Sequence, residues 1–375
     1  MYKDVIEKLC EAGLDPAKTA SETKEKTGKG LVGCFPVRTP EEIVYAAGCI
    51  PVGMWGGKTE LKLSDKYLQS FCCAVMRTNL EFAMKGVYND LKAVIIPTFC
   101  DSMKCMVENW KLALPEMPLI AFAYPQQTRI PAGFQFTIDE IKRVKHELEL
   151  ILHKIITTEA VEEAYAVYEE YRKAMREFTE LAAEHPSVIT CRKRHLIIKA
   201  GNFMDKAEYT ELIKEINEGL KAEPEDSFKG KKAVITGLMC EPVEILDIMD
   251  ENGFAIAADD LSLGSRLWRV PGREDVKDVY DRMAYMISDI EGDTFFYDKD
   301  KTKGAHLIET VKEKKADCVI VMMQKFCDPE EYDYPIYKAE LAEAGIPELY
   351  LEFDQQLSSF EQIRTRVQSF SEMLL

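Results

Sequence analysis

Two cysteines occupy matching positions in the sequence, each shortly after an apolar run and directly before an aspartate. Cys100 precedes Asp101, and Cys327 precedes Asp328. The apolar runs predict buried strands, and a helix is expected to start at each cysteine, with the aspartate able to cap it. A helix start offers free N–H groups and the positive end of the helix dipole, which lower the pKa of a thiol and stabilise anions. Both cysteines are therefore candidates for chemistry.

A third candidate is Cys73, which we expect in the first turn of a helix that begins near Ser70. Open α/β sheets bind ligands at the carboxyl edge of their strands, so cysteines at three helix starts can converge on one cleft. The spacing alone leaves two interpretations open, namely three buried thiols or a metal site. Three thiolates without a histidine favour a soft metal centre. An iron–sulfur cluster suits them better than zinc, which usually recruits a fourth side chain.

The chain has 11 cysteines, and for a protein that is not secreted they are not expected to form a disulfide framework. No C-x-x-C occurs, which argues against a zinc ribbon, a thioredoxin-type site or a ferredoxin-type run. We expect most of the cysteines to be small buried side chains. Cys34, Cys49, Cys72 and Cys105 lie near the candidates in sequence, and Cys105 is expected to face the core because it lies more than one helical turn after Cys100.

Other motifs in the sequence do not match the pattern that their function requires. Residues 28–33 (GKGLVG) fit G-x-G-x-x-G but precede a strand, so a dinucleotide site is rejected. Residues 53–59 (GMWGGKT) resemble a phosphate-binding loop, but Val52 stands where its first glycine is required, and we expect a glycine-rich turn at the cleft edge instead. No G-x-S-x-G is present, and the five histidines are scattered. No catalytic acid or base is therefore assigned.

Apolar strands and helices alternate around the candidate cysteines, which is typical of a parallel α/β sheet. Between about 138 and 222 the pattern is almost wholly helical, and a second α/β unit begins at 231. The expected segments are an N-terminal helical segment at 1–30, a first α/β lobe at 31–137, a helical connector at 138–226 and a second α/β lobe at 227–375.

The two α/β units look like copies of one plan. The sequence PEEI at 40–43 has a counterpart in PVEI at 242–245, and the segment around Cys100 has one around Cys327. We therefore predict an α/β fold with two related Rossmann- or flavodoxin-like lobes. Each lobe has a parallel sheet, a helical segment joins them, and a cluster, if the three cysteines form one, is expected in the cleft between them.

Charge and hydropathy exclude several classes of partner. The chain carries 48 basic and 65 acidic residues, a net charge of −17, so neither nucleic acid nor an anionic membrane is an expected partner. No apolar run approaches the roughly 20 residues that span a bilayer, and the N-terminus has no signal-peptide core. We expect a soluble, cytoplasmic protein.

With these features the chain resembles the β subunit of (R)-2-hydroxyacyl-CoA dehydratases, over nearly its whole length. The most specific motif is KFCDPEEYDYP at 325–335, around Cys327. The shorter motifs are GCFP at 33–36, PEE at 40–42, PVGMWG at 51–56, CDS at 100–102, DQQ at 354–356 and FEQIRTR at 360–366. One departure is Arg38-Thr39, where the family often has a cysteine or an aromatic residue.

The resemblance implies a heterodimer with a homologous α subunit, each subunit holding a [4Fe-4S] cluster on three cysteines, here Cys73, Cys100 and Cys327. It implies an ATP-hydrolysing iron–sulfur activator protein that injects one electron, which this chain relays. The 2-hydroxyacyl-CoA substrate would bind mainly to the partner subunit, where its thioester becomes a ketyl radical anion and expels the neighbouring hydroxyl. Deprotonation and loss of the electron then yield the (E)-2-enoyl-CoA, so the electron is recycled. Some relatives also carry a flavin, for which this sequence has no fingerprint.

Three alternatives stay open. A double-cubane-type ATP-driven reductase would need more ligands, and Cys34, Cys49, Cys72 and Cys105 could supply them. An electron-carrying subunit of a benzoyl-CoA-type reductase is the second alternative, and an α/β binding protein with buried cysteines is the third. The sequence does not name the acyl group, because the substrate pocket would lie mostly in the partner.

Overall fold

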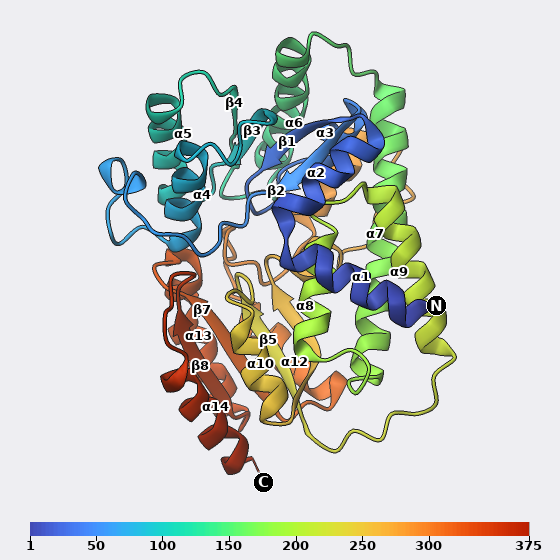
Figure 1. Cartoon of the computed structure of the whole chain (residues 1–375), viewed down its shortest axis with the longest axis vertical. Coiled ribbons are helices and arrows are strands. Elements are labelled where there is room, and N and C mark those ends of the chain that lie inside the picture. The colour runs from blue at the N-terminus through green and yellow to red at the C-terminus, as the bar shows by residue number, and fades with distance from the viewer. Residues whose placement is uncertain (375) are drawn as a thin grey trace.

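The computed structural model describes residues 1–374 and contains two four-stranded parallel sheets with helices around them (Figure 1). In Figure 1 the first sheet lies in the upper half of the molecule and the second sheet in the lower half. The predicted class, two Rossmann-like α/β lobes with parallel sheets, is confirmed.

The first sheet has the strand order β2-β1-β3-β4. Its strands are β1 (Gly30–Cys34), β2 (Cys49–Gly53), β3 (Leu91–Pro97) and β4 (Leu119–Phe122). All neighbours are parallel, and Cys34 at the end of β1 lies opposite Gly53 and Ile95. The carboxyl ends of the strands therefore share one edge, where loops can form a site.

The second sheet repeats this topology with the order β6-β5-β7-β8. Its strands are β5 (Lys231–Gly237), β6 (Phe254–Leu261), β7 (Cys318–Gln324) and β8 (Glu348–Phe353). Both sheets place their first strand between the second and the third, and this shared order agrees with the predicted duplication of one plan. Because the two connections that lead to Cys100 and Cys327 follow the equivalent strands β3 and β7, the repeat brings these cysteines to equivalent edges.

Fourteen α-helices surround the sheets in the described chain. They are α1 (Tyr2–Leu14), α2 (Pro16–Thr27), α3 (Glu41–Ala46), α4 (Ala74–Met84), α5 (Asp101–Ala113), α6 (Pro131–Leu152), α7 (Thr158–Glu184), α8 (Cys191–Ala200), α9 (Lys206–Lys221), α10 (Glu244–Glu251), α11 (Val279–Ser288), α12 (Lys303–Lys314), α13 (Asp328–Glu343) and α14 (Glu361–Met373). No helix within residues 1–374 combines the length and the apolarity needed to cross a bilayer.

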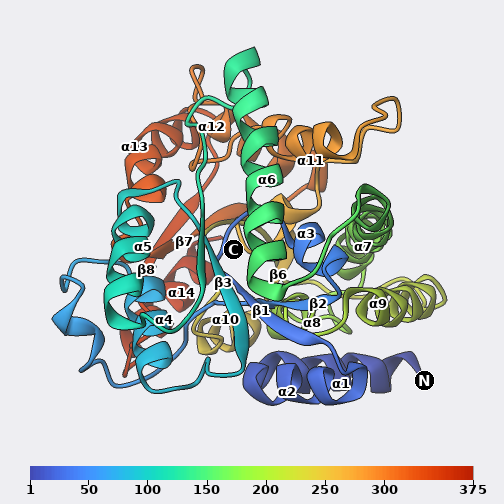
Figure 2. The same ribbon diagram turned by 90° about the horizontal axis from the view of Figure 1, so that it is seen from above.

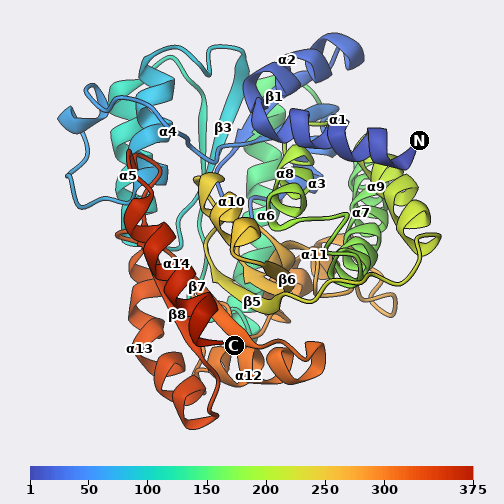
Figure 3. The ribbon, with the colours of Figure 1, turned by 60° about the horizontal axis from the view of Figure 1, so that its bottom comes forward.

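Alternating side chains of the second sheet face two separate helical layers. Ile235 and Ile320 pack with α10 and α14, whereas Val234 and Val319 pack with α12 and α13. Figure 3 shows these two helix pairs around the strands. Side chains two residues apart share a face of a strand, so the apolar runs of β5 and β7 are explained by burial on both faces.

Helices also connect the two lobes. The long helix α7 runs beside both of them in Figure 1, and α6 of the first lobe packs against α11 (Figure 2). At that contact the rings of Phe134 and Tyr285 lie 4.5 Å apart. We keep the four segments 1–30, 31–137, 138–226 and 227–375 as a proposal for the domain organisation; α6 begins at Pro131 and reaches across the second boundary.

Candidate functional site

The three candidate cysteines are the N-cap residues of three helices. Cys73 precedes α4, Cys100 precedes α5 and Cys327 precedes α13. The predicted capping role of Asp101 and Asp328 is wrong, because both aspartates are the first residues inside their helices. Their carboxylates still lie at the positive end of the helix dipole, where a negative charge is favourable.

Cys73 lies directly before its helix, and not in the first turn as expected from the sequence. Helix α4 begins at Ala74 instead of near Ser70, because Cys73 has an extended backbone with ψ of 147°. Phe71, which was expected inside this helix, lies before it and has an exposed side chain. The thiol of Cys73 therefore stands at the helix entrance and not along its side.

All three cysteines line one cavity, which encloses about 440 Å³ including its opening to solvent. The first lobe contributes Cys73 and Cys100, and the second contributes Cys327, so the cavity lies between the lobes. Most of the other wall residues are apolar: Pro36, Val75, Met76, Phe99, Met103, Leu238, Phe295, Phe326 and Pro329. Such a wall keeps water away from a bound group and strengthens the electrostatic effect of nearby charges.

Burial favours the protonated form of these thiols. It raises the pKa of Cys100 to about 11, and burial followed by the negative charge of Glu330 raises the pKa of Cys327 well above its ordinary value. The backbone N–H groups of Met103 and Glu330, each three residues after the cysteine, act in the opposite direction. A metal that binds here must release the protons, since the thiolate is the ligand.

Cys73 and Cys72 have opposite pKa shifts. The neighbouring Cys73 side chain, with Ser102 and the charge of Arg77, lowers the pKa of Cys72 to about 7 although burial acts in the other direction. The neighbouring Cys72 side chain, then burial, raises the pKa of Cys73. Cys72 itself does not line the cavity.

The remaining cysteines of the described chain lie outside this cavity. Cys34 and Cys49 are buried in the first lobe, as expected for small apolar side chains. The prediction that Cys105 faces the core is wrong, because it is exposed. Helix α5 turns Met106 and Trp110 toward the core, and Cys105 lies on the other side of the helix.

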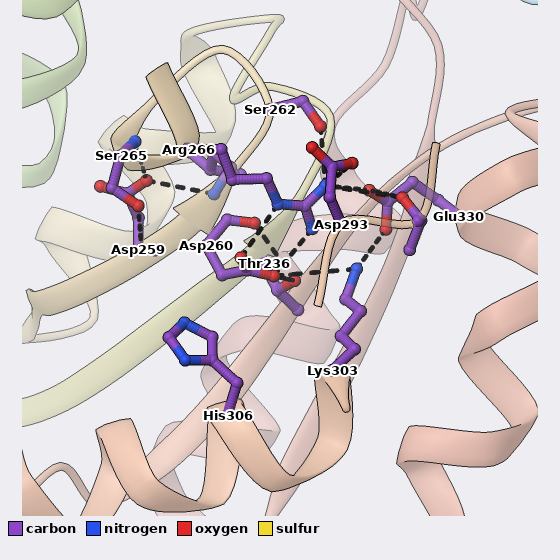
Figure 4. Close-up of polar contacts among 12 residues, drawn as sticks. Thr236, Asp259, Asp260, Ser262, Ser265, Arg266, Asp293, Lys303, His306 and Glu330 are labelled. Atoms are coloured by element: carbon purple, nitrogen blue, oxygen red, sulfur yellow. Dashed lines mark hydrogen bonds and ion pairs between the residues drawn. The ribbon is translucent and has the colours of Figure 1, made fainter. Parts of the chain in front are cut away.

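Sequence reasoning missed a buried charge network that includes Glu330, the third residue of the helix that Cys327 caps (Figure 4). It links Asp260 at the end of β6, Arg266, Lys303 and Glu330. A signal was available, since two aspartates stand at the end of the apolar run that forms β6. Charges at the end of a buried strand require partners, and their partners indicate which loops meet there.

The types of side chain that line the cavity fit the donor set of an iron–sulfur cluster. Across residues 1–374 no three histidine, cysteine, aspartate or glutamate side chains lie close enough together to hold one metal ion. In a cluster each thiolate binds a different iron, so the sulfur atoms stand further apart. Three thiols on an apolar cavity wall, with no histidine among the lining residues, match that donor set.

Comparison with known proteins gives a consistent result over the full length. The family model of the "2-hydroxyglutaryl-CoA dehydratase, D-component" matches residues 36–374. The chain is 42% identical over 372 residues to the beta subunit of the lactoyl-CoA dehydratase of Anaerotignum propionicum, with 99% of this chain and 98% of the relative covered. It is 39% identical over 373 residues to the (R)-phenyllactyl-CoA dehydratase beta subunit of Clostridium sporogenes, with 100% and 97% covered. A more distant relative, one of the subunits of the benzoyl-CoA reductase of Thauera aromatica, is 24% identical over 384 residues, with 99% and 98% covered.

Proposed function

The chain belongs to the 2-hydroxyglutaryl-CoA dehydratase D-component family, as its motifs predicted, and from this premise we propose that it is the β subunit of a heterodimeric (R)-2-hydroxyacyl-CoA dehydratase. This enzyme is a hydro-lyase that removes water from its substrate to give the 2-enoyl-CoA. The observation that carries the proposal is the meeting of Cys73, Cys100 and Cys327 in one apolar cavity between the lobes. The higher identity to dehydratase subunits favours this function over a benzoyl-CoA-type reductase.

In this proposal Cys73, Cys100 and Cys327 hold a [4Fe-4S] cluster, which supplies one-electron transfer when bound. The protein contributes the three thiolates, and the helix entrances at α4, α5 and α13 present N–H groups that stabilise their negative charge. Phe99, Phe295 and Phe326 cover the cavity with apolar surface. A flavin is not part of the proposal.

The chemistry of the substrate explains why such a subunit is needed. The hydroxyl group leaves from the α carbon against the usual polarity of a thioester, and the β-proton is too weakly acidic to be removed directly. A substrate ketyl radical removes both obstacles, which requires one electron. We propose that an ATP-hydrolysing iron–sulfur activator delivers it and that this chain relays it to the partner.

The partner subunit would provide most of the substrate site. Among the described lining residues of the cysteine cavity, Asp328 is the only carboxylic acid, and no histidine or lysine is present. That set offers no pair of groups for general acid–base catalysis. We therefore place the 2-hydroxyacyl-CoA mainly in a homologous α subunit, and we propose a cytoplasmic location for the complex.

The proposal is tested by purifying the chain without oxygen and measuring iron, acid-labile sulfide and zinc. We expect about four iron atoms per chain, as one [4Fe-4S] cluster requires, with the spectroscopic signature of a single such cluster. Zinc in place of iron, or no metal at all, would contradict the proposal. Two clusters per chain would favour the double-cubane reductase instead.

A further inference from the structure

A buried ion-pair network meets the first turn of α13 at Glu330 and has no role in the function proposed so far. Its centre is Arg266, whose side chain is 0% exposed. The guanidinium donates from Nε to Asp260 Oδ1 at 2.9 Å and from its second terminal nitrogen to Asp260 Oδ2 at 2.7 Å. Its first terminal nitrogen lies 3.0 Å from Glu330 Oε1 (Figure 4). Both carboxylates are thus fixed by one buried cation.

Glu330 brings this network to the entrance of the helix that Cys327 caps. It is the third residue of α13, three positions after the cysteine. Its Oε2 accepts from Lys303 Nζ at 2.5 Å, and its Oε1 also accepts from the Thr294 hydroxyl at 2.8 Å. Burial by itself would raise the pKa of Glu330, but Lys303 and Arg266 hold it below its ordinary value. Glu330 is therefore an anion at neutral pH.

The network also reaches the other wall of the cavity. Asp293 Oδ1 lies 3.6 Å from Arg266, and Asp293 Oδ2 lies 2.9 Å from Arg38 of the first lobe. Arg38 follows Pro36, which lines the cysteine cavity, by two residues. The same set of charges therefore joins the two lobes beside the cavity.

The charges of Glu330 and Lys303 have opposite effects on negative charge in the cavity. Glu330 stands three positions after Cys327, about one helical turn, so its buried carboxylate and the Lys303 ammonium bound to it lie beside the helix entrance that the Cys327 thiol occupies. Lys303 is nearly as buried as Glu330, with 4% and 1% of their side chains exposed, so water screens neither charge well. An electron added in the cavity would meet repulsion from one charge and attraction from the other.

We propose that this network sets the reduction potential of the metal group that Cys327 would hold, with Glu330 making the group harder to reduce and Lys303 making it easier. The inference rests on the proposed function, since it requires a redox group in the cavity. Glu330 and Lys303 act through Cys327 and the cavity field, and they are tuning and positioning residues, not catalytic residues.

The test compares midpoint potentials of Glu330→Gln, Lys303→Gln and the double variant, purified without oxygen and titrated with spectroscopic detection. We expect a shift to more positive potential for Glu330→Gln, a shift to more negative potential for Lys303→Gln, and a potential near that of the parent for the double variant. The control is Asp205→Asn, which removes the charge of a buried carboxylate paired with Lys29 at 2.7 Å, next to the amino end of β1 and thus at the sheet edge opposite the cysteine cavity. It should leave the potential unchanged.

Shifts of the same sign, or no shift in variants that retain iron, would overturn the inference and indicate a purely structural network. If either buried variant does not fold, the midpoint potential of Arg269→Gln tests the inference instead. Arg269 pairs with Asp260 at 2.5 Å but is 18% exposed, so its removal disturbs packing less. We expect a smaller negative shift there, and an unchanged potential would overturn the inference. Absence of iron from the parent protein would instead refute the proposed function.

Discussion

At the scale of single residues, the three cysteines are unusual choices for the positions that they occupy. An N-cap side chain normally accepts a hydrogen bond from the helix entrance, and serine, threonine, aspartate and asparagine do this best. A thiol is a weak acceptor, and the side chains of Cys73, Cys100 and Cys327 make no capping hydrogen bond. Replacing a good cap by a poor one costs roughly 1 kcal/mol. Three such positions around one cavity favour a role as ligands over a role in packing.

The first prediction concerns Cys327→Ser. Serine is nearly isosteric and a better N-cap, so the metal-free variant should be as stable as the parent or more stable by up to about 1 kcal/mol. If Cys327 is a ligand, the variant should lose most of its iron and its electron transfer. Iron content and thermal unfolding measured on the same anaerobic sample check both parts.

The control for that experiment is Cys191→Ser. Cys191 is buried in the helical connector at the start of α8, and its thiol lies 3.4 Å from the carbonyl oxygen of Phe254. A serine hydroxyl can keep that contact, and the residue does not line the cysteine cavity. Cys191→Ser should therefore keep the full iron content. Normal iron content and normal turnover in Cys327→Ser would refute the assignment of Cys327.

At the scale of elements, α4 must hold Cys73 and also anchor the loop before it. Glu81 on α4 is buried and accepts backbone N–H groups from Lys62, Leu63 and Ser64 at 3.0, 2.8 and 2.9 Å. Burial by itself would raise the pKa of Glu81, but these donors and Lys85 lower it to about 2. A single carboxylate thus closes the loop onto the helix that Cys73 caps.

The second prediction is that Glu81→Gln destabilises the protein by about 2–3 kcal/mol at neutral pH, because one buried anion loses its charge among three N–H donors. The pKa of Glu81 is lower in the folded protein, at about 2, than its ordinary value of 4.5. Its stabilising effect is therefore present above pH 4.5 and is lost as the pH falls toward 2. Urea unfolding of parent and variant at several pH values checks this. A difference that stays constant below pH 4.5 would contradict it.

Elements were predictable from the sequence where periodicity and chain order determine them. The strands around Cys100 and Cys327, and the repeat that relates them, follow from apolar runs that are buried on both faces. The start of α4 was not predictable to the residue, because the apolar Phe71 continues the pattern while its side chain is exposed. The contact between Glu330 and Arg266 could not be predicted from the sequence either, because only the folded lobe brings those two segments together.

At the scale of the whole molecule, the third prediction is that this chain is inactive without a homologous partner. Among the described residues that line the cysteine cavity there is no pair of acid–base groups, so we expect the proposed subunit to relay an electron and the partner to complete the elimination of water. We expect a stable complex when both subunits are produced together, and turnover only when the activator and ATP are also present. Dehydration by this chain and the activator alone would contradict the proposal.

The two lobes are also joined at the glycine-rich turn that resembled a phosphate-binding loop. Gln355 of the second lobe is 2% exposed and donates to the carbonyl oxygen of Trp55 at 2.7 Å. Its side-chain oxygen accepts from the Thr78 hydroxyl at 3.1 Å, and Gln356 donates to the carbonyl oxygen of Gly57 at 2.9 Å. Gly56 of this turn therefore serves close packing between the lobes, because an added Cβ would meet the Gln355 side chain. This contact keeps the helix entrances at Cys73 and Cys327 in a fixed relation.

The last prediction tests this contact with Gly56→Ala. Gly56 has a positive φ of 73°, and an added Cβ would lie 2.6 Å from the Gln355 side-chain oxygen and collide with the Thr78 hydroxyl. Gly28→Ala is the matched control. Gly28 has a similar φ of 67°, but an added Cβ would have no atom within 4 Å. Both substitutions strain the backbone by about 1 kcal/mol, while only Gly56→Ala also breaks buried hydrogen bonds, for a total loss of about 2–4 kcal/mol. Urea unfolding of the two variants should separate them, and Gly56→Ala should hold iron less tightly because its lobes are no longer fixed. Equal losses of stability would show that the glutamine contact does not hold the lobes together.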